Sequence, residues 1–211
     1  MVKLYVEGGG DSTFLQAQCR RGFHEFLKKA GLKGKMPRIT ACGGRQQAYD
    51  HYCTALKRGE PAVLLVDSET PIAPEHQQPK NQPAQWLPWQ HLKARSGDGW
   101  SPPANALDND CHLMVQVMES WFLADRDTLK AFFGPGFREN ALPAVNPDNI
   151  ERVPKDEIYK ALKQATQHCK TKYSKGELSF KLLAEIDPAK VMAASPWAKR
   201  FVITLKEKMR K

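Results

Sequence analysis

Short apolar runs and helical apolar spacing alternate over the first third of the chain. The runs VKLYV (2–6), RITAC (38–42) and AVLLV (62–66) predict three strands, and the unbroken third run is typical of a strand buried on both faces of a parallel sheet. Between the runs, apolar residues recur at helical spacing until a glycine ends each segment, at Gly31 and at Gly59. This alternation predicts an α/β fold, with a mainly parallel sheet flanked by helices.

The pattern changes between residues 70 and 110. This segment holds seven prolines and three tryptophans, with a short helix expected only near residues 82–93, and it predicts a long insertion over the rim of the sheet. Regular spacing returns in CHLMVQVM (111–118), which predicts a fourth strand, and in ESWFLADRDTLKAFFG (119–134), which predicts a helix. We interpret residues 1–133 as one α/β core that carries this insertion.

The remaining residues, 134–211, predict a different organisation. Their pattern is irregular to about residue 153, becomes helical over 154–170 and is helical again near the C-terminus. Lys and Arg outnumber Asp and Glu by 16 to 9 here but only by 16 to 14 in residues 1–133, so most of the net charge of +9 lies in this region. A basic, mainly helical C-terminal region is typical of a protein that binds a polyanion such as nucleic acid, and equally of a solvated helical surface.

Composition limits the compartment and the class of protein. The chain is 41% hydrophobic, yet no apolar run approaches the roughly 20 residues of a membrane helix, and MVKLYVEGGG lacks the layout of a signal peptide. The five cysteines are scattered and form no CxxC pair, so the pattern predicts neither a disulfide framework nor a zinc site. We therefore expect a cytoplasmic protein without a membrane partner.

Acidic residues follow three of the predicted strands. Glu7 ends the first, Asp67 and Glu69 follow the third, and Glu119 ends the fourth. Because the carboxyl ends of parallel strands share one edge of a sheet, we expect the four carboxylates to meet there, with Asp67 and Glu69 on the same side of an extended backbone. Neighbouring carboxylates repel one another, so the cluster needs a counter-charge, and its hard oxygen ligands favour Mg²⁺ or Mn²⁺.

The glycines that follow Glu7 admit more than one interpretation. GGGDST has neither the spacing of a GxGxxG fingerprint nor the GK[ST] of a P-loop, so it does not predict a phosphate-binding loop. Glycine lets the backbone turn sharply, which favours Glu7 as a metal ligand or a proton-transfer group. Glu7 also suits the start of a helix as a dipole cap, and Asp67 alone also suits a solvated turn.

Two basic features are candidates for contacts with phosphate. Arg45 follows two glycines at a strand-to-helix turn on the same edge as the acids, where it can grip a phosphate with two hydrogen bonds or form an ion pair with Glu or Asp. The second feature is the segment HCKTKYSKGE, which we expect to be flexible and which contains Lys170, Lys172 and Lys175. Together with Tyr173, these lysines suit contacts with a nucleic-acid backbone, or simply a solvated loop.

Two motifs carry a resemblance to a known domain. A strand ending in Glu-Gly and a later strand ending in Asp-x-Asp/Glu, here Glu7-Gly8 and Asp67-Ser68-Glu69, resemble the Toprim domain of topoisomerases, primases and overcoming-lysogenization-defect nucleases. Over its full length, the chain is similar to a bacterial Toprim-like family often encoded beside an ABC-type ATPase. The stretches that carry this second resemblance are YVEGGGDS, GGR, LLVDSE, HLMVQVMESWFLAD and IDPAKVMAASPWAKRF.

The resemblance implies roles for the acidic residues. In Toprim enzymes the Glu is a general acid or base and the Asp pair holds Mg²⁺, which assigns the first role to Glu7 and the second to Asp67 and Glu69, with a Glu in place of the second Asp. Glu119 is a candidate ligand for a second metal. The chain is too short for the separate tyrosine domain of a topoisomerase, so we do not expect that activity.

The resemblance also implies a function. It predicts a metal-dependent nuclease that cleaves DNA or RNA, as the effector of an antiphage system with a partner ATPase. Two alternatives stay open at this point. One is a non-catalytic nucleic-acid-binding or regulatory module of an ATPase complex, and the other is a metal-dependent phosphotransferase or phosphatase.

Overall fold

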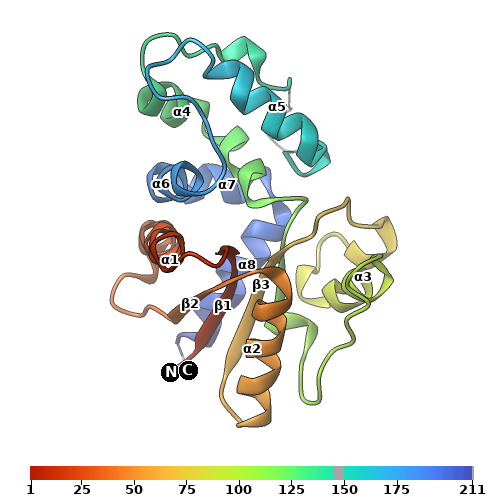
Figure 1. Ribbon diagram of the computed structural model, residues 1–211. Coiled ribbons are helices and arrows are strands. Elements are labelled where there is room, and N and C mark those ends of the chain that lie inside the picture. The colour runs from red at the N-terminus through yellow and green to blue at the C-terminus, as the bar shows by residue number, and fades with distance from the viewer. Residues whose placement is uncertain (145–149, 211) are drawn as a thin grey trace.

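The computed structural model describes residues 1–144 and 150–210, and its centre is a sheet of four parallel strands (Figure 1). The strands stand in the order β2-β1-β3-β4. Their bounds are Lys3–Gly9 for β1, Arg38–Gly43 for β2, Ala62–Asp67 for β3 and Cys111–Met114 for β4. The predicted α/β fold with a parallel sheet flanked by helices is confirmed.

Both faces of the sheet are buried, because alternate residues of each strand enter separate apolar clusters. Leu4 and Val6 of β1 belong to one cluster, whereas Tyr5 belongs to the other. In β3, Val63 and Leu65 face the first cluster while Leu64 and Val66 face the second, and all four are fully buried. The continuous apolar run of β3 is therefore explained by helices on both sides of the sheet.

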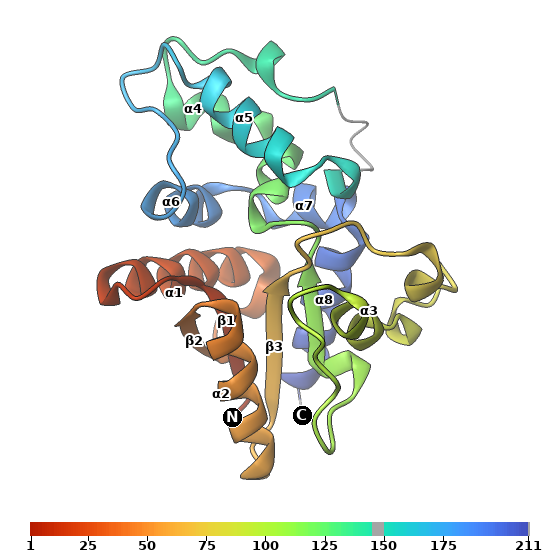
Figure 2. The same ribbon diagram turned by 45° about the vertical axis from the view of Figure 1, so that its right-hand side comes forward.

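Eight α-helices surround the sheet within the described residues. They are α1 (Thr13–Leu27), α2 (Arg45–Lys57), α3 (Pro88–Ala94), α4 (Arg126–Phe133), α5 (Lys155–Ala165), α6 (Glu177–Glu185), α7 (Pro188–Ala194) and α8 (Pro196–Lys208). α1 lies over one face with α6 beside it, and α2 and α3 cover the other face (Figures 1 and 2). α4 and α5 lie farthest from the sheet, beyond the carboxyl ends of the strands, and α8 packs against β4.

The sequence predicted that the insertion at 70–110 lies over the rim of the sheet, and the structure shows that it also forms part of the core. Its tryptophans Trp86, Trp89 and Trp100 are buried in the apolar cluster on the α2 face, and its one α-helix is α3. β4 is an edge strand; α2 packs on β1, β2 and β3, whereas α3 of the insertion packs on β4. The many prolines had indicated an irregular surface segment, although the segment contributes buried side chains to the core.

The predicted strand at 111–118 and helix at 119–134 are both shorter than expected. β4 ends at Met114 because its neighbour β3 ends at Asp67, the residue that pairs with Met114, and no partner strand continues. A 3-10 helix at Met118–Ala124 follows, and α4 begins only after Asp125. The Asp125 carboxylate accepts hydrogen bonds from the backbone N–H and the hydroxyl of Thr128, so this residue caps α4 and interrupts the helix.

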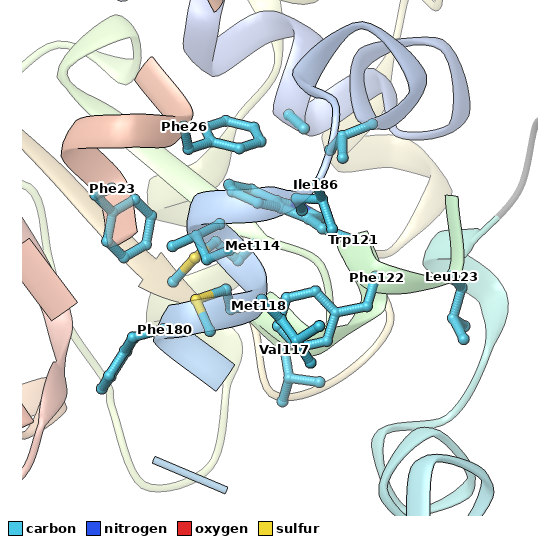
Figure 3. Packing of buried hydrophobic residues seen from close by; sticks show 14 of the residues in the cluster. Phe23, Phe26, Met114, Val117, Met118, Trp121, Phe122, Leu123, Phe180 and Ile186 are labelled. Atoms are coloured by element: carbon cyan, nitrogen blue, oxygen red, sulfur yellow. The ribbon is translucent and has the colours of Figure 1, made fainter. Parts of the chain in front are cut away.

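The 3-10 helix at Met118–Ala124 belongs to the core. Figure 3 shows Trp121 beside Phe26 and close to Phe23, both from α1; the Trp121 and Phe26 rings are stacked with centroids 5.1 Å apart. Trp121, Phe122 and Leu129 are fully buried.

The C-terminal region is mainly helical, as predicted, and it is joined to the sheet by a buried arginine. Arg200 of α8 donates hydrogen bonds to the carbonyls of Cys111, Asp108 and Pro83, at 2.7–2.8 Å. These contacts link α8 to β4 and to the insertion. The irregular stretch expected up to residue 153 contains only short 3-10 helices where it is described, and residues 145–149 lie outside the described residues.

Two further expectations concern the cysteines and the membrane. All five cysteines are free. Among the described residues, the helices lack the combination of length and apolar character that crossing a bilayer requires.

Truncation of a tryptophan of the insertion tests whether this segment is part of the core. Trp89 is 3% exposed, and Trp89→Ala should lower the free energy of unfolding by about 3–5 kcal/mol because it leaves a cavity under β4. Leu107→Ala, in the same segment at 64% exposure, is the matched control and should change it by less than about 0.5 kcal/mol. Urea denaturation measures both; equal effects of the two variants would mean that the insertion is not core.

Candidate metal centre

Three of the four predicted carboxylates meet at the carboxyl edge of the sheet. Glu7 lies near the end of β1, Asp67 ends β3, and Glu69 follows two residues later. One carboxylate oxygen from each residue lies within 4.8 Å of those from the other two. β1 and β3 are neighbours at the centre of the sheet, so their carboxyl ends bring these residues together as the sequence predicted.

The backbone at Glu69 is not extended, contrary to the expectation for residues 67–69. Glu69 has a φ of 65°, in the left-handed region that a residue with a Cβ rarely adopts. Its N–H donates to the carbonyl of Gln116 at 2.7 Å, which holds the turn against the segment after β4. A strained residue of this kind, next to two other carboxylates, is typical of a functional site.

Each of the three carboxylates is anchored through one of its oxygens. Glu7 Oε2 accepts hydrogen bonds from the Arg45 guanidinium (3.1 Å) and from the Asp67 N–H (3.2 Å). Asp67 Oδ1 accepts from the N–H of Met118 (2.8 Å). Glu69 Oε2 accepts from the Lys155 ammonium (2.7 Å).

The second oxygens of these carboxylates have no such partner. Within residues 1–144 and 150–210, no group donates a hydrogen bond to Glu7 Oε1, Asp67 Oδ2 or Glu69 Oε1. Three oriented carboxylates, each with one oxygen available, form a donor set that suits Mg²⁺ or Mn²⁺, which prefer hard oxygen ligands at about 2.1 Å and keep several waters. The residues present therefore fit a hard divalent cation.

Burial and mutual repulsion shape the electrostatics of this cluster. Burial, followed by the charges of Glu7 and Glu119, raises the pKa of Asp67 well above its ordinary value. Burial also raises the pKa of Glu7, although Arg45 and the Asp67 N–H oppose the shift. Without a further cation, the folded protein thus favours a proton on this pair, which is the behaviour expected of a site designed to receive positive charge.

Glu119 lines a cavity together with Glu7 and Asp67 but lies outside the three-carboxylate group. The sequence had predicted that Glu119 ends a strand, but the residue belongs to the 3-10 helix at Met118–Ala124. Both of its oxygens accept hydrogen bonds from hydroxyls, Oε1 from Tyr173 (3.1 Å) and Ser179 (2.9 Å), and Oε2 from Tyr159 (3.4 Å). Its proposed role as a ligand of a second metal stays a prediction.

Arg45 forms the ion pair that was the alternative to a phosphate contact. Its guanidinium binds both carboxylate oxygens of Asp98, at 2.8 and 2.6 Å, and a third nitrogen reaches Glu7 and the carbonyl of Asp67. It also lies 5.0 Å from the centre of the Trp100 ring. Asp98 and Trp100 come from the insertion, which therefore holds Arg45 against Glu7.

The basic segment 168–177 divides into two parts. Lys175 lines the cavity beside the carboxylates, and its ammonium lies 5.0 Å from the centre of the Tyr159 ring. Lys170 and Lys172 are exposed. The sequence had suggested that Tyr173 is a surface residue that contacts nucleic acid. Instead, Tyr173 is buried and donates a hydrogen bond to Glu119.

Glu7 and Asp67 line a cavity of about 400 Å³. The turn of Gly8, Gly9 and Gly10 forms part of its wall, and Gly43 faces this turn. A Cβ at Gly43 would lie 2.4 Å from the Gly10 carbonyl oxygen, so only glycine permits this approach of the two backbones. The glycines after Glu7 thus shape the cavity, in agreement with their interpretation as turn residues.

Sequence reasoning missed several residues of the site. Lys155 starts α5, far along the chain from Glu69, and Asp98 lies in an insertion without regular spacing. Tyr159 and Ser179 reach Glu119 from α5 and α6. No local signal identifies them, because each acts through a contact that only the tertiary fold creates.

Comparison with known proteins gives a family but no activity. The family model described as "Domain of unknown function (DUF4276)" matches residues 6–206. No curated protein and no solved structure matches the chain. The match includes the glycine turn, the carboxylates and the C-terminal helices.

The raised pKa of Asp67 predicts how stability depends on pH in the metal-free protein. The folded state holds this proton more tightly than the unfolded chain, where the pKa is about 3.9. As the pH rises from the unfolded-state pKa to the folded-state pKa of Asp67, the stability of the fold falls. Above the folded-state pKa, the contribution of this proton to stability is lost completely. Asp67→Asn should therefore melt at a higher temperature than wild type at pH 8 in chelator, and the difference should shrink toward pH 4.

Melting curves between pH 4 and 9 test this expectation. Asp50→Asn, which removes an exposed carboxylate from α2, is the matched control and should run parallel to wild type. An Asp67→Asn protein that melts lower than wild type at pH 8 would mean that the Asp67 charge stabilises the fold and is not held under repulsion.

Proposed function

We propose that this chain, which belongs to the DUF4276 family, is a nuclease that cleaves phosphodiester bonds of DNA or RNA with the help of Mg²⁺ or Mn²⁺. The observation that carries the proposal is the set of three anchored carboxylates, each with a free oxygen, that meet within 4.8 Å of one another. Two of them, Glu7 and Asp67, line a cavity. The basic C-terminal region and Lys175, which lines the cavity, support a polyanionic substrate. The resemblance to Toprim domains supports the same assignment.

The roles of the carboxylates follow from their contacts. When bound, a divalent ion supplies positive charge for the oxygens of a phosphate and acidity for an attacking water. Asp67 and Glu69 would hold it, since their second oxygens are free. Glu7, whose pKa is raised by burial, would accept or return a proton, and Arg45 would keep its carboxylate oriented by holding Oε2.

The basic residues have separate roles in this proposal. Lys155 neutralises Glu69 before the substrate arrives, and Lys175 contacts a phosphate that enters the cavity. Lys170 and Lys172 lie on the exposed part of the same segment as Lys175 and would extend the contact along a nucleic-acid backbone.

The cellular setting is also part of the proposal. The resemblance to a family often encoded beside an ABC-type ATPase favours a partner ATPase and a role in antiphage defence. The five free cysteines suit a reducing cytoplasm. If the next experiment shows no cleavage, the protein would instead be a non-catalytic module of such a complex.

A metal-dependent cleavage assay tests the proposal. Wild type should cleave labelled DNA or RNA with Mn²⁺ or Mg²⁺ and not with chelator, and Mn²⁺ should raise its melting temperature. Asp67→Asn should lose at least about 100-fold in cleavage rate and most of the Mn²⁺-induced rise, because one charged ligand is lost. Asp50→Asn, on the exposed face of α2, should retain both properties.

The same assay can contradict the proposal. A wild-type protein whose melting temperature does not respond to Mn²⁺, and which cleaves no nucleic acid even with a partner ATPase present, would instead be a binding or regulatory module.

The three lysines of segment 168–177 predict a salt-dependent affinity. In chelator, replacing Lys170, Lys172 and Lys175 by Ala should weaken binding to a single-stranded oligonucleotide and reduce the slope of log affinity against log salt by about 2, since each lost phosphate contact removes about 0.7. The control variant replaces Lys33, Lys35 and Lys57, which are exposed near the opposite edge of the sheet, and should keep the wild-type slope. Equal slopes for both triple variants would make segment 168–177 an ordinary solvated surface.

A further inference from the structure

The cavity at the carboxylates has an apolar half that metal binding does not use. Met114, Met118 and Phe180 line it together with Leu15 of α1. Figure 3 shows Met114 and Met118 beside each other, with Phe180 next to them. A site that needed only to hold an ion and a phosphate would have no use for such a wall, because both ligands are fully hydrated before they bind.

The carboxylates are also too recessed to meet a phosphate on the surface of a duplex. Asp67 is 7% exposed, and the side chains of Glu7 and Glu69 are 18% and 20% exposed. A phosphate that reaches Glu7 and Asp67 must enter the cavity that these two residues line, and it brings the attached sugar and base with it. In a duplex that base is paired and stacked, so entry requires its separation from the stack.

The rest of the cavity wall is polar, so one cavity combines an apolar side with a polar side. Lys175 and Ser179 line it, and Ser179 is bound to Glu119. Apolar side chains with a few convergent polar groups are the usual composition of a small-molecule pocket, and about 400 Å³ is within the range for a ligand of nucleotide size. Methionine is flexible and polarisable, so Met114 and Met118 can pack against any base.

We infer that the cavity receives one unstacked nucleotide next to the scissile phosphate, so that the substrate is single-stranded nucleic acid or a frayed end and not a continuous duplex. This inference rests on the proposed nuclease function. The carboxylate side of the cavity takes the phosphate, Lys175 contacts the same or the adjoining phosphate, and the methionine side packs against the base. Contacts of this kind read no base edge, which predicts weak sequence preference.

Binding in the absence of cleavage tests the inference directly. The probes are a labelled single-stranded oligonucleotide and the same sequence closed into a dumbbell duplex without ends, both in Ca²⁺ or in chelator. We expect the single strand to bind at least about 30-fold more tightly than the dumbbell and, with Mn²⁺, to be cleaved at least about 100-fold faster, since the duplex must first unpair and unstack one nucleotide. Equal affinities for the two probes would overturn the inference.

A cavity-filling variant separates the nucleotide pocket from the metal centre. Leu15→Trp places a larger side chain in the apolar half, so single-strand affinity should fall at least about tenfold while the Mn²⁺-induced rise in melting temperature remains. Phe14→Trp is the matched control, because Phe14 is the neighbouring residue of α1 but is 54% exposed, and it should bind like wild type. Leu15→Phe gives a smaller version of the same change if Leu15→Trp fails to fold.

The outcomes distinguish the two proposals. Wild-type affinity in a folded Leu15→Trp protein would overturn the nucleotide pocket and leave the nuclease in place. Selective single-strand binding that depends on Leu15, without any cleavage or metal response, would support the pocket and overturn the nuclease.

Discussion

Repulsion among three carboxylates at the carboxyl ends of the two central strands is the constraint on which the rest of the site depends. β1 and β3 are neighbours, so Glu7 and Asp67 are forced together, and the left-handed turn at Glu69 adds a third acid. The protein offsets this repulsion only in part, with one cation on Glu7, one on Glu69 and an N–H on Asp67. Burial, and after it the neighbouring carboxylates, raises the pKa values of Glu7 and Asp67, and a bound divalent cation would favour the charged form of both.

The partners of these acids come from distant parts of the chain. The insertion supplies Asp98 and Trp100, which hold Arg45, and α5 supplies Lys155. The segment before α6 supplies Lys175, and the 3-10 helix after β4 supplies the N–H of Met118. The long insertion and the C-terminal helices are therefore parts of one site as well as parts of one core, which agrees with a family match that spans residues 6–206.

Local pattern was sufficient for the sheet and for the acids at its edge, because strand ends and carboxylates are both visible in the sequence. It was insufficient where tertiary contacts decide. Proline hid the burial of the insertion, Asp125 interrupted a helix by capping the next one, and the turn at Glu69 replaced an extended backbone. Arg45 shows the limit for charges, since a phosphate contact and an ion pair have the same sequence signature, and only the position of Asp98 separates them.

The most direct test of the metal centre is a crystal grown with Mn²⁺ and measured near the manganese absorption edge. The account predicts one strong anomalous peak at the carboxyl ends of β1 and β3, within about 2.1–2.3 Å of the free oxygens of Asp67 and Glu69 and close to Glu7. It also predicts that Arg45 stays bound to Glu7 and Asp98. An anomalous map without a peak at these carboxylates at millimolar Mn²⁺, or with the ion only at surface acids, would contradict the account.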